Sequence, residues 1–159
     1  MVIDQHTQVV KTEQKRGWFP VNTRPRLPVS GGRTSINLLG AVTDDGDRFI
    51  VLVPGRLTGA VAKHFFRALQ QEFGQNLAIV LDNAPYFIAK VLKKQAAADG
   101  LLLEYLPPYS PELNPLEQWW RQLKAKRANR LFRTIDDLKS FLTTALPTLT
   151  TPRIYEYLC

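Results

Sequence analysis

Cysteine is almost absent from this chain of 159 residues, because the only one is the last residue, Cys159. A single cysteine excludes an intrachain disulfide framework and a cysteine-based zinc site. It fits a reducing compartment, so we expect a cytoplasmic protein. The sequence also lacks an apolar run of membrane-spanning length, and the region after Met1 lacks the basic and apolar parts of a signal peptide. No association with a membrane is therefore expected.

Acidic residues are scarce relative to basic ones. The chain has 14 Asp and Glu against 21 Lys and Arg, which gives a formal net charge of +7 and a pI near 9.8. Such an excess favours a polyanionic partner, nucleic acid above all, although a merely soluble basic protein would show it too. Hydrophobic residues make up 45% of the chain, which is typical of a globular protein, and the length suits one domain over residues 1–159.

Hydrophobic periodicity divides the chain into short strands and longer helices. Alternating or continuous apolar runs predict strands at 2–10, 34–43, 48–53, 77–81 and 101–106. Helical spacing predicts helices at about 59–73, 87–98, 115–132 and 135–145. Thr58 should cap the first helix and Gly74 should close it, while Trp119 and Trp120 should pack in the core. Antiparallel strands come first and helix-connected strands follow, which predicts a mixed α/β sheet with helices on its faces.

Three carboxylates are candidates for chemistry, and each has a structural alternative. Asp82 directly follows a continuous apolar run, at the end of a strand where ligands usually bind, but it could simply cap the next turn. Glu117 has capping-box spacing from Asn114 and could bind its backbone, or it could pair with Arg121 one turn later. Asp4 lies in a strand, where an isolated carboxylate usually faces solvent. The residue patterns leave these alternatives open.

Two segments resemble a known family. Residues 105–124, YLPPYSPELNPLEQWWRQLK, closely resemble the signature around the last catalytic acid of DDE transposases, in the bacterial insertion-sequence branch of the Tc/mariner superfamily. Residues 81–86, LDNAPY, resemble the block around the second acid, and the 34 residues between Asp82 and Glu117 are the spacing typical of that branch. Asp4 has the place of the first acid. The family commonly has glutamate and histidine where Gln5 and Phe87 stand, and neither departure removes a metal ligand.

The resemblance implies both a fold and a chemistry. The fold would be ribonuclease-H-like, with a mixed five-stranded sheet and helices on both faces. Asp4, Asp82 and Glu117 would bind two Mg²⁺ ions, or Mn²⁺ in their place, for cleavage and strand transfer of DNA in transposition. Carboxylate oxygens suit these hard cations, and cations would relieve the repulsion among three neighbouring carboxylates.

The resemblance also implies partners. These are DNA, as transposon ends and target, and a second copy of the chain in a dimer or larger assembly, with a prokaryotic, nucleoid-associated location. Two basic clusters are expected to contact phosphates, namely Lys11, Lys15, Arg16, Arg24, Arg26 and Arg33, and Arg121, Lys124, Lys126 and Arg127. No helix-turn-helix region precedes the first strand, so the chain is expected to be a catalytic domain alone. Two alternatives are another ribonuclease-H-like nuclease and a truncated remnant that only binds DNA or dimerises.

Overall fold

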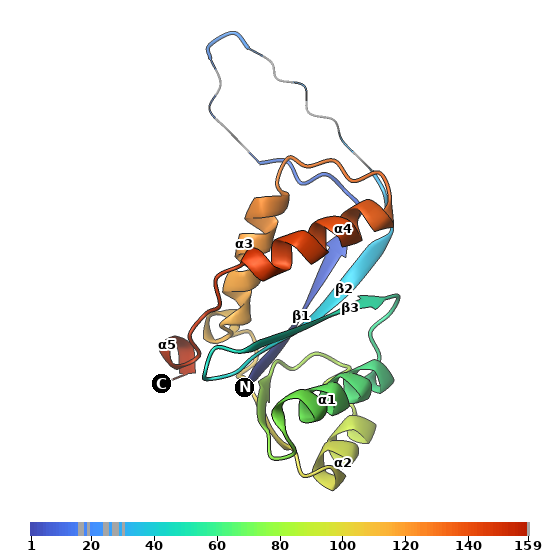
Figure 1. Cartoon of the computed structure of the whole chain (residues 1–159), viewed down its shortest axis with the longest axis vertical. Helices are drawn as coiled ribbons and strands as arrows, with labels where there is room; N and C mark the ends of the chain where they lie inside the picture. The colour runs from blue at the N-terminus through green and yellow to red at the C-terminus, as the bar shows by residue number, and fades with distance from the viewer. Residues whose placement is uncertain (16–17, 19, 24–25, 27–28, 30, 159) are drawn as a thin grey trace.

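The fold is built on one mixed β-sheet, seen in a computed structural model that describes residues 1–15, 18, 20–23, 26, 29 and 31–158 (Figure 1). Within this part of the chain the strands are β1 (Val2–Val9), β2 (Ser35–Val42), β3 (Arg48–Pro54), β4 (Ala78–Leu81) and β5 (Leu102–Tyr105). Their order in the sheet is β3-β2-β1-β4-β5. The first three strands pair antiparallel, whereas β4 pairs parallel with β1 and β5 pairs parallel with β4. The predicted mixed five-stranded sheet is confirmed.

Helices cover both faces of the sheet (Figure 1). They are α1 (Gly59–Phe73), α2 (Lys90–Ala98), α3 (Leu116–Arg127), α4 (Ile135–Ala145) and α5 (Tyr155–Leu158), with short 3₁₀ turns at Pro111–Leu113 and Leu146–Thr148. One core cluster joins α1 and α2 to the sheet, and a second joins α3 and α4 to its other face. No helix in the described part of the chain has the length and apolarity needed to cross a membrane.

Two helix boundaries differ from the prediction. The second helix begins at Lys90 and not at residue 87, because a turn precedes it, in which the Ala84 carbonyl accepts hydrogen bonds from the N–H groups of Phe87 and Ile88. The third helix ends at Arg127 and not near residue 132, since Asn129 takes the left-handed conformation, with φ of 62°. The first helix is as predicted, with Thr58 Oγ1 accepting from the Val61 N–H.

Gly40 in β2 allows α3 to approach the sheet closely. It pairs with Asp4 of β1, and a Cβ atom at this position would lie 2.9 Å from Leu116 Cδ2 and 3.1 Å from Trp120 Cη2. Both contacts are too short for carbon atoms, and both side chains are buried in the core. A side chain at residue 40 would therefore push α3 away from the strands.

We expect Gly40→Ala to destabilise the protein by about 1–3 kcal/mol, the usual effect of overpacking a core. Urea denaturation followed by circular dichroism measures this loss. Gly31→Ala is the matched control, because a Cβ atom there meets no atom of the residues that the structure describes within 4 Å. Equal denaturation midpoints for the two variants would show that α3 does not depend on the close approach at Gly40.

Candidate active site

The register of two parallel strands brings Asp4 and Asp82 to the same level of the sheet. Val2 of β1 is aligned with Val80 of β4. Asp4 and Asp82 each follow two residues later, so their side chains project from the same face, the face that α3 covers. Asp82 comes directly after β4, and Asp4 lies inside β1, which continues to Val9 through its pairing with β2.

Glu117 reaches the same place from the first turn of α3. Asn114 starts this helix, since its side-chain oxygen accepts from the Leu116 N–H at 3.1 Å. The Asn114 N–H donates to the Pro111 carbonyl at 3.0 Å, so the capping-box interpretation of Glu117 is wrong. The alternative ion pair with Arg121 is also absent among the described residues, which leaves the Glu117 carboxylate unpaired there.

All three carboxylates line one cavity of about 460 Å³. The loops that follow β4 and β5 form the rest of its wall, with Asn83, Ala84, Leu106, Pro107, Pro108, Tyr109, Ser110, Pro111 and Asn114. The Asn83 amide donates to the Leu106 carbonyl at 2.7 Å and thereby joins the two loops. The sequence-predicted acids are thus brought together at the carboxyl ends of the parallel strands.

Asp4 is the buried member of the three, with 6% of its surface exposed. The expectation that a strand carboxylate at this position faces solvent is therefore wrong, because α3 covers it. One carboxylate oxygen accepts from the Gln5 N–H at 2.7 Å, and the other accepts from Trp120 Nε1 at 2.8 Å. Burial, with a smaller contribution from the nearby carboxylates of Asp82 and Glu117, raises the pKa of Asp4 to about 7 against the effect of these hydrogen bonds.

Asp82 does what its turn context predicts and also lines the cavity. One of its oxygens accepts from the Ala84 N–H at 3.1 Å, which is the turn interaction expected of aspartate. The residue is nevertheless partly exposed toward the cavity that Asp4 and Glu117 share. The structural and chemical interpretations of Asp82 are therefore compatible.

The donor atoms of the site are hard oxygens, which suit Mg²⁺ or Mn²⁺. Taken as they stand, no three His, Cys, Asp or Glu side chains within the described ranges are close enough to share one metal ion. The three carboxylates surround a cavity and do not meet at a point. The cavity therefore presents the oxygens of three carboxylates, which are ligands that hard divalent cations prefer.

The predicted phosphate contacts are mostly exposed. Exposed side chains belong to Lys11, Lys15, Arg26, Arg33, Arg121, Lys124 and Lys126. Arg16 and Arg24 lie outside the described residues. The exposed cations on α3 lie along the same helix as Glu117.

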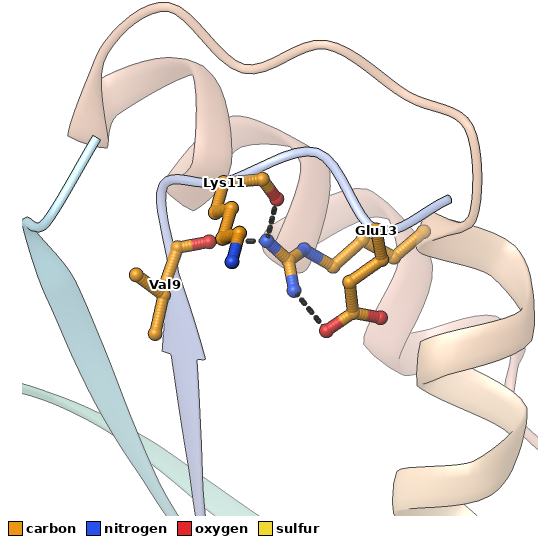
Figure 2. Close-up of polar contacts among 4 residues, drawn as sticks. Val9, Lys11 and Glu13 are labelled. Atoms are coloured by element: carbon orange, nitrogen blue, oxygen red, sulfur yellow. Dashed lines mark hydrogen bonds and ion pairs between the residues drawn. The ribbon is translucent and has the colours of Figure 1, made fainter. Parts of the chain in front are cut away.

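The prediction that Arg127 contacts phosphates is wrong, because only 2% of its surface is exposed. Its guanidinium forms an ion pair with Glu13 at 2.6 Å and donates to the carbonyls of Val9 and Lys11 (Figure 2). It also lies over the ring of Phe132, 5.6 Å from the centroid. Arg127 thus joins the end of α3 to the chain that leaves β1, and its donors are not available to a phosphate.

Sequence reasoning missed a polar network beside the site. Gln5, noted only as a departure from the family, contacts Thr7 at 2.7 Å and Asn37 at 3.2 Å, and its side-chain amide is hydrogen-bonded to the Tyr86 hydroxyl at 3.2 Å. Burial, together with Asp82 and Asp4, raises the pKa of Tyr86. The network connects β1, which carries Asp4, to the turn after Asp82. Its one sequence signal is the unbroken run of polar residues from Asp4 to Gln8 in β1.

Comparison with known proteins agrees with this fold and site. Residues 1–139 match the family described as DDE superfamily endonuclease. An uncharacterized protein of Sinorhizobium fredii, y4pE/y4sA, is 36% identical over 66 residues, which are 41% of this chain and 47% of that protein.

Among solved structures, a pre-cleavage Mos1 transpososome is similar, with a TM-score of 0.78 at 14% identity over 99% of this chain and 51% of that chain. The catalytic domain of Mos1 mariner transposase gives 0.67 at 15% identity over 99% of this chain and 74% of that one. The chain thus spans about half the length of the Sinorhizobium protein and of the Mos1 chain in the transpososome. The fold is ribonuclease-H-like, and by its match over residues 1–139 the chain belongs to the DDE superfamily endonuclease family.

Proposed function

We propose that this chain is the catalytic domain of a Tc/mariner-type DDE transposase, which cleaves DNA strands and transfers them to a target. The observation that carries the proposal is the convergence of Asp4, Asp82 and Glu117 on one cavity, in a chain of the DDE endonuclease family. These residues come from separate elements, and no structural partner explains Glu117 within the described chain. A group of three carboxylates serves stability poorly, since like charges repel, and serves cation binding well.

We propose Asp4, Asp82 and Glu117 as the ligands of two Mg²⁺ or Mn²⁺ ions. Mos1 paired-end complexes with Mn and with Mg are similar to this chain at 17% identity. Bound cations of this kind activate an attacking water or 3′-hydroxyl and stabilise the leaving oxygen. The protein supplies a rigid strand for Asp4, a turn for Asp82 and a helix start for Glu117, and so fixes the ligands before DNA binds.

The partners follow from the charge and from the relatives. The exposed cations of α3 and of the chain after β1 are proposed to contact DNA phosphates. The similar Mos1 structures include a transpososome and a paired-end complex, so we propose assembly of at least two copies on DNA ends. We propose that residues 1–159 form one catalytic domain. We also propose that the protein is cytoplasmic, prokaryotic and associated with the nucleoid. Another ribonuclease-H-like nuclease is less consistent with the family match.

Glu117→Gln tests the function, because it removes one ligand charge and keeps the shape of the side chain. We expect Mn²⁺-dependent nicking of supercoiled plasmid DNA to fall by at least about 10²-fold, as when a group acting only in the reaction is removed. Thermal unfolding should change little, since Glu117 has no partner in the described chain.

The matched control is Glu112→Gln, at an exposed residue five positions earlier that does not line the cavity. Nicking by this variant should equal that of the wild type. A wild-type protein that binds no Mn²⁺ by calorimetry and nicks no DNA would overturn the proposal and would favour a remnant that only binds DNA or dimerises.

A further inference from the structure

Trp120 is related to two of the three carboxylates, since it is hydrogen-bonded to Asp4 and lies on the same helix as Glu117. It lies on α3, three residues after Glu117, and its side chain is fully buried between the helix and the sheet. Its indole N–H donates to Asp4 Oδ2 at 2.8 Å, across a sequence separation of 116 residues. Asp4 therefore takes its orientation from the helix that carries Glu117. The lone pairs of the Asp4 carboxylate that do not accept from the Trp120 N–H point in other directions, away from the indole.

The indole ring is itself held on several sides. The His6 ring stacks on it, with centroids 5.2 Å apart and planes 12° apart. Trp119 meets it edge-on at 6.4 Å. Gly40 pairs with Asp4 across β1 and β2, and it has no side chain where the indole ring lies. A Cβ atom there would be too close to the ring. The ring therefore has little freedom to turn its N–H away from Asp4.

We propose that Trp120 is a positioning residue, whose indole N–H fixes the Asp4 carboxylate for cation binding. The inference rests on the proposed function, since it assumes that Asp4 is a ligand. Groups that hydrogen-bond a metal ligand from behind set its orientation, and their loss usually weakens metal binding by about 10–100-fold. Core packing alone would need an apolar ring at residue 120 and no N–H donor.

The neighbouring tryptophan provides a matched control within the same helix. Trp119 is equally buried, and its indole N–H donates to the Thr150 carbonyl at 2.9 Å. Trp119→Phe and Trp120→Phe each remove one indole hydrogen bond and a similar amount of packing. They differ in that the acceptor is a backbone carbonyl in one case and the candidate ligand Asp4 in the other.

The experiment compares Mn²⁺ affinity by isothermal titration calorimetry for the wild type and both variants, with thermal unfolding of each. We expect the Kd of Trp120→Phe to rise by about 10–100-fold, and that of Trp119→Phe to stay within about 3-fold of the wild type. Both should lose comparable thermal stability. If Trp120→Phe does not fold, Trp120→Met serves in its place, with Trp119→Met as its control, because methionine fills irregular core space and carries no N–H donor.

Two results would overturn the inference, and they are distinguishable. Wild-type Mn²⁺ binding with equal affinity in Trp120→Phe and Trp119→Phe means that the N–H positions nothing, and leaves the proposed function intact. Absence of Mn²⁺ binding by the wild type overturns both the metal site and the role of Trp120. With the methionine variants as substitutes, equal Kd values for Trp120→Met and Trp119→Met count against the inference in the same way.

Discussion

Replacing Asp4 by asparagine is expected to stabilise the metal-free protein and at the same time to abolish Mn²⁺-dependent cleavage. Asp4 is buried, and its pKa is raised from near 3.8 to about 7, so near neutral pH the folded protein has to hold a charge in a poorly solvated place. Asparagine removes that charge. It also removes one anionic ligand from the cavity, so cleavage should fall on the order of 10³-fold or more.

The pH dependence of this stabilisation has a definite sign. The Asp4 carboxyl binds its proton more tightly in the folded state, so the stability of the wild type falls as pH rises from about 4 through about 7. Asparagine stays neutral throughout. The advantage of Asp4→Asn is therefore absent below about pH 4 and complete above about pH 7.

The size of the effect is limited by the hydrogen bonds that Asp4 accepts. A rise of this size in the pKa corresponds to about 4 kcal/mol. Asparagine has one side-chain oxygen in place of two, and its amide nitrogen cannot accept a hydrogen bond. One of the two bonds, from Trp120 Nε1 or from the Gln5 N–H, is therefore lost, which costs about 1 kcal/mol or more. The net gain at pH 8 should be about 1–3 kcal/mol.

Urea denaturation in EDTA at pH 5 and pH 8 measures this gain, with Asp45→Asn as the control at an exposed turn. A denaturation midpoint of Asp4→Asn that lies below that of the wild type at pH 8 would contradict the burial argument. Cleavage at the wild-type rate by Asp4→Asn would instead remove Asp4 from the proposed ligand set, whatever its effect on stability.

The parts of the site that sequence could predict are those with local signals. Asp82 follows a continuous apolar strand, and Glu117 stands in a dense motif at a helix start, so the family resemblance had a local pattern to rest on at both residues, although each pattern alone left a structural alternative open. Asp4 could be placed only by resemblance. Its burial depends on the alignment of Val2 with Val80 and on Gly40 allowing α3 to approach, and both are tertiary contacts. Trp120 was correctly predicted to be buried, but its hydrogen-bond partner lies far away in the sequence.

The wrong assignment of Arg127 has a related cause. A run of cations at the end of a helix predicts an exposed basic face, and Lys124 and Lys126 obey that prediction. Helical spacing also places Arg127 on the buried side, four residues after Leu123, yet burial of an arginine requires partners that the run itself does not reveal. Those partners are Glu13 and two carbonyls from the chain after β1. Charge alone cannot distinguish a phosphate contact from such an internal connection.

Replacing Arg127 by methionine is accordingly expected to lower stability and to leave intrinsic DNA affinity unchanged. Methionine fills similar space but donates nothing, so the ion pair with Glu13 and the bonds to the carbonyls of Val9 and Lys11 are lost (Figure 2). Hydrogen bonds from a charged donor contribute about 1.5–3 kcal/mol each. Part of this loss is offset, because desolvating the guanidinium is unfavourable and its Nε has no partner among the described residues. We expect a net loss of about 2–4 kcal/mol in the free energy of unfolding.

The neighbouring Lys126→Met separates the two roles. Lys126 is exposed, so this variant should lose no more than about 0.5 kcal/mol in stability. Its affinity for duplex DNA should fall, and the slope of log K against log salt should decrease by about 1, as for one lost phosphate contact. Arg127→Met, measured where it remains folded, should keep the wild-type slope. The opposite pattern, with a reduced slope for Arg127→Met and unchanged stability, would mean that the guanidinium leaves Glu13 and reaches DNA, since one side chain cannot make both sets of contacts at once.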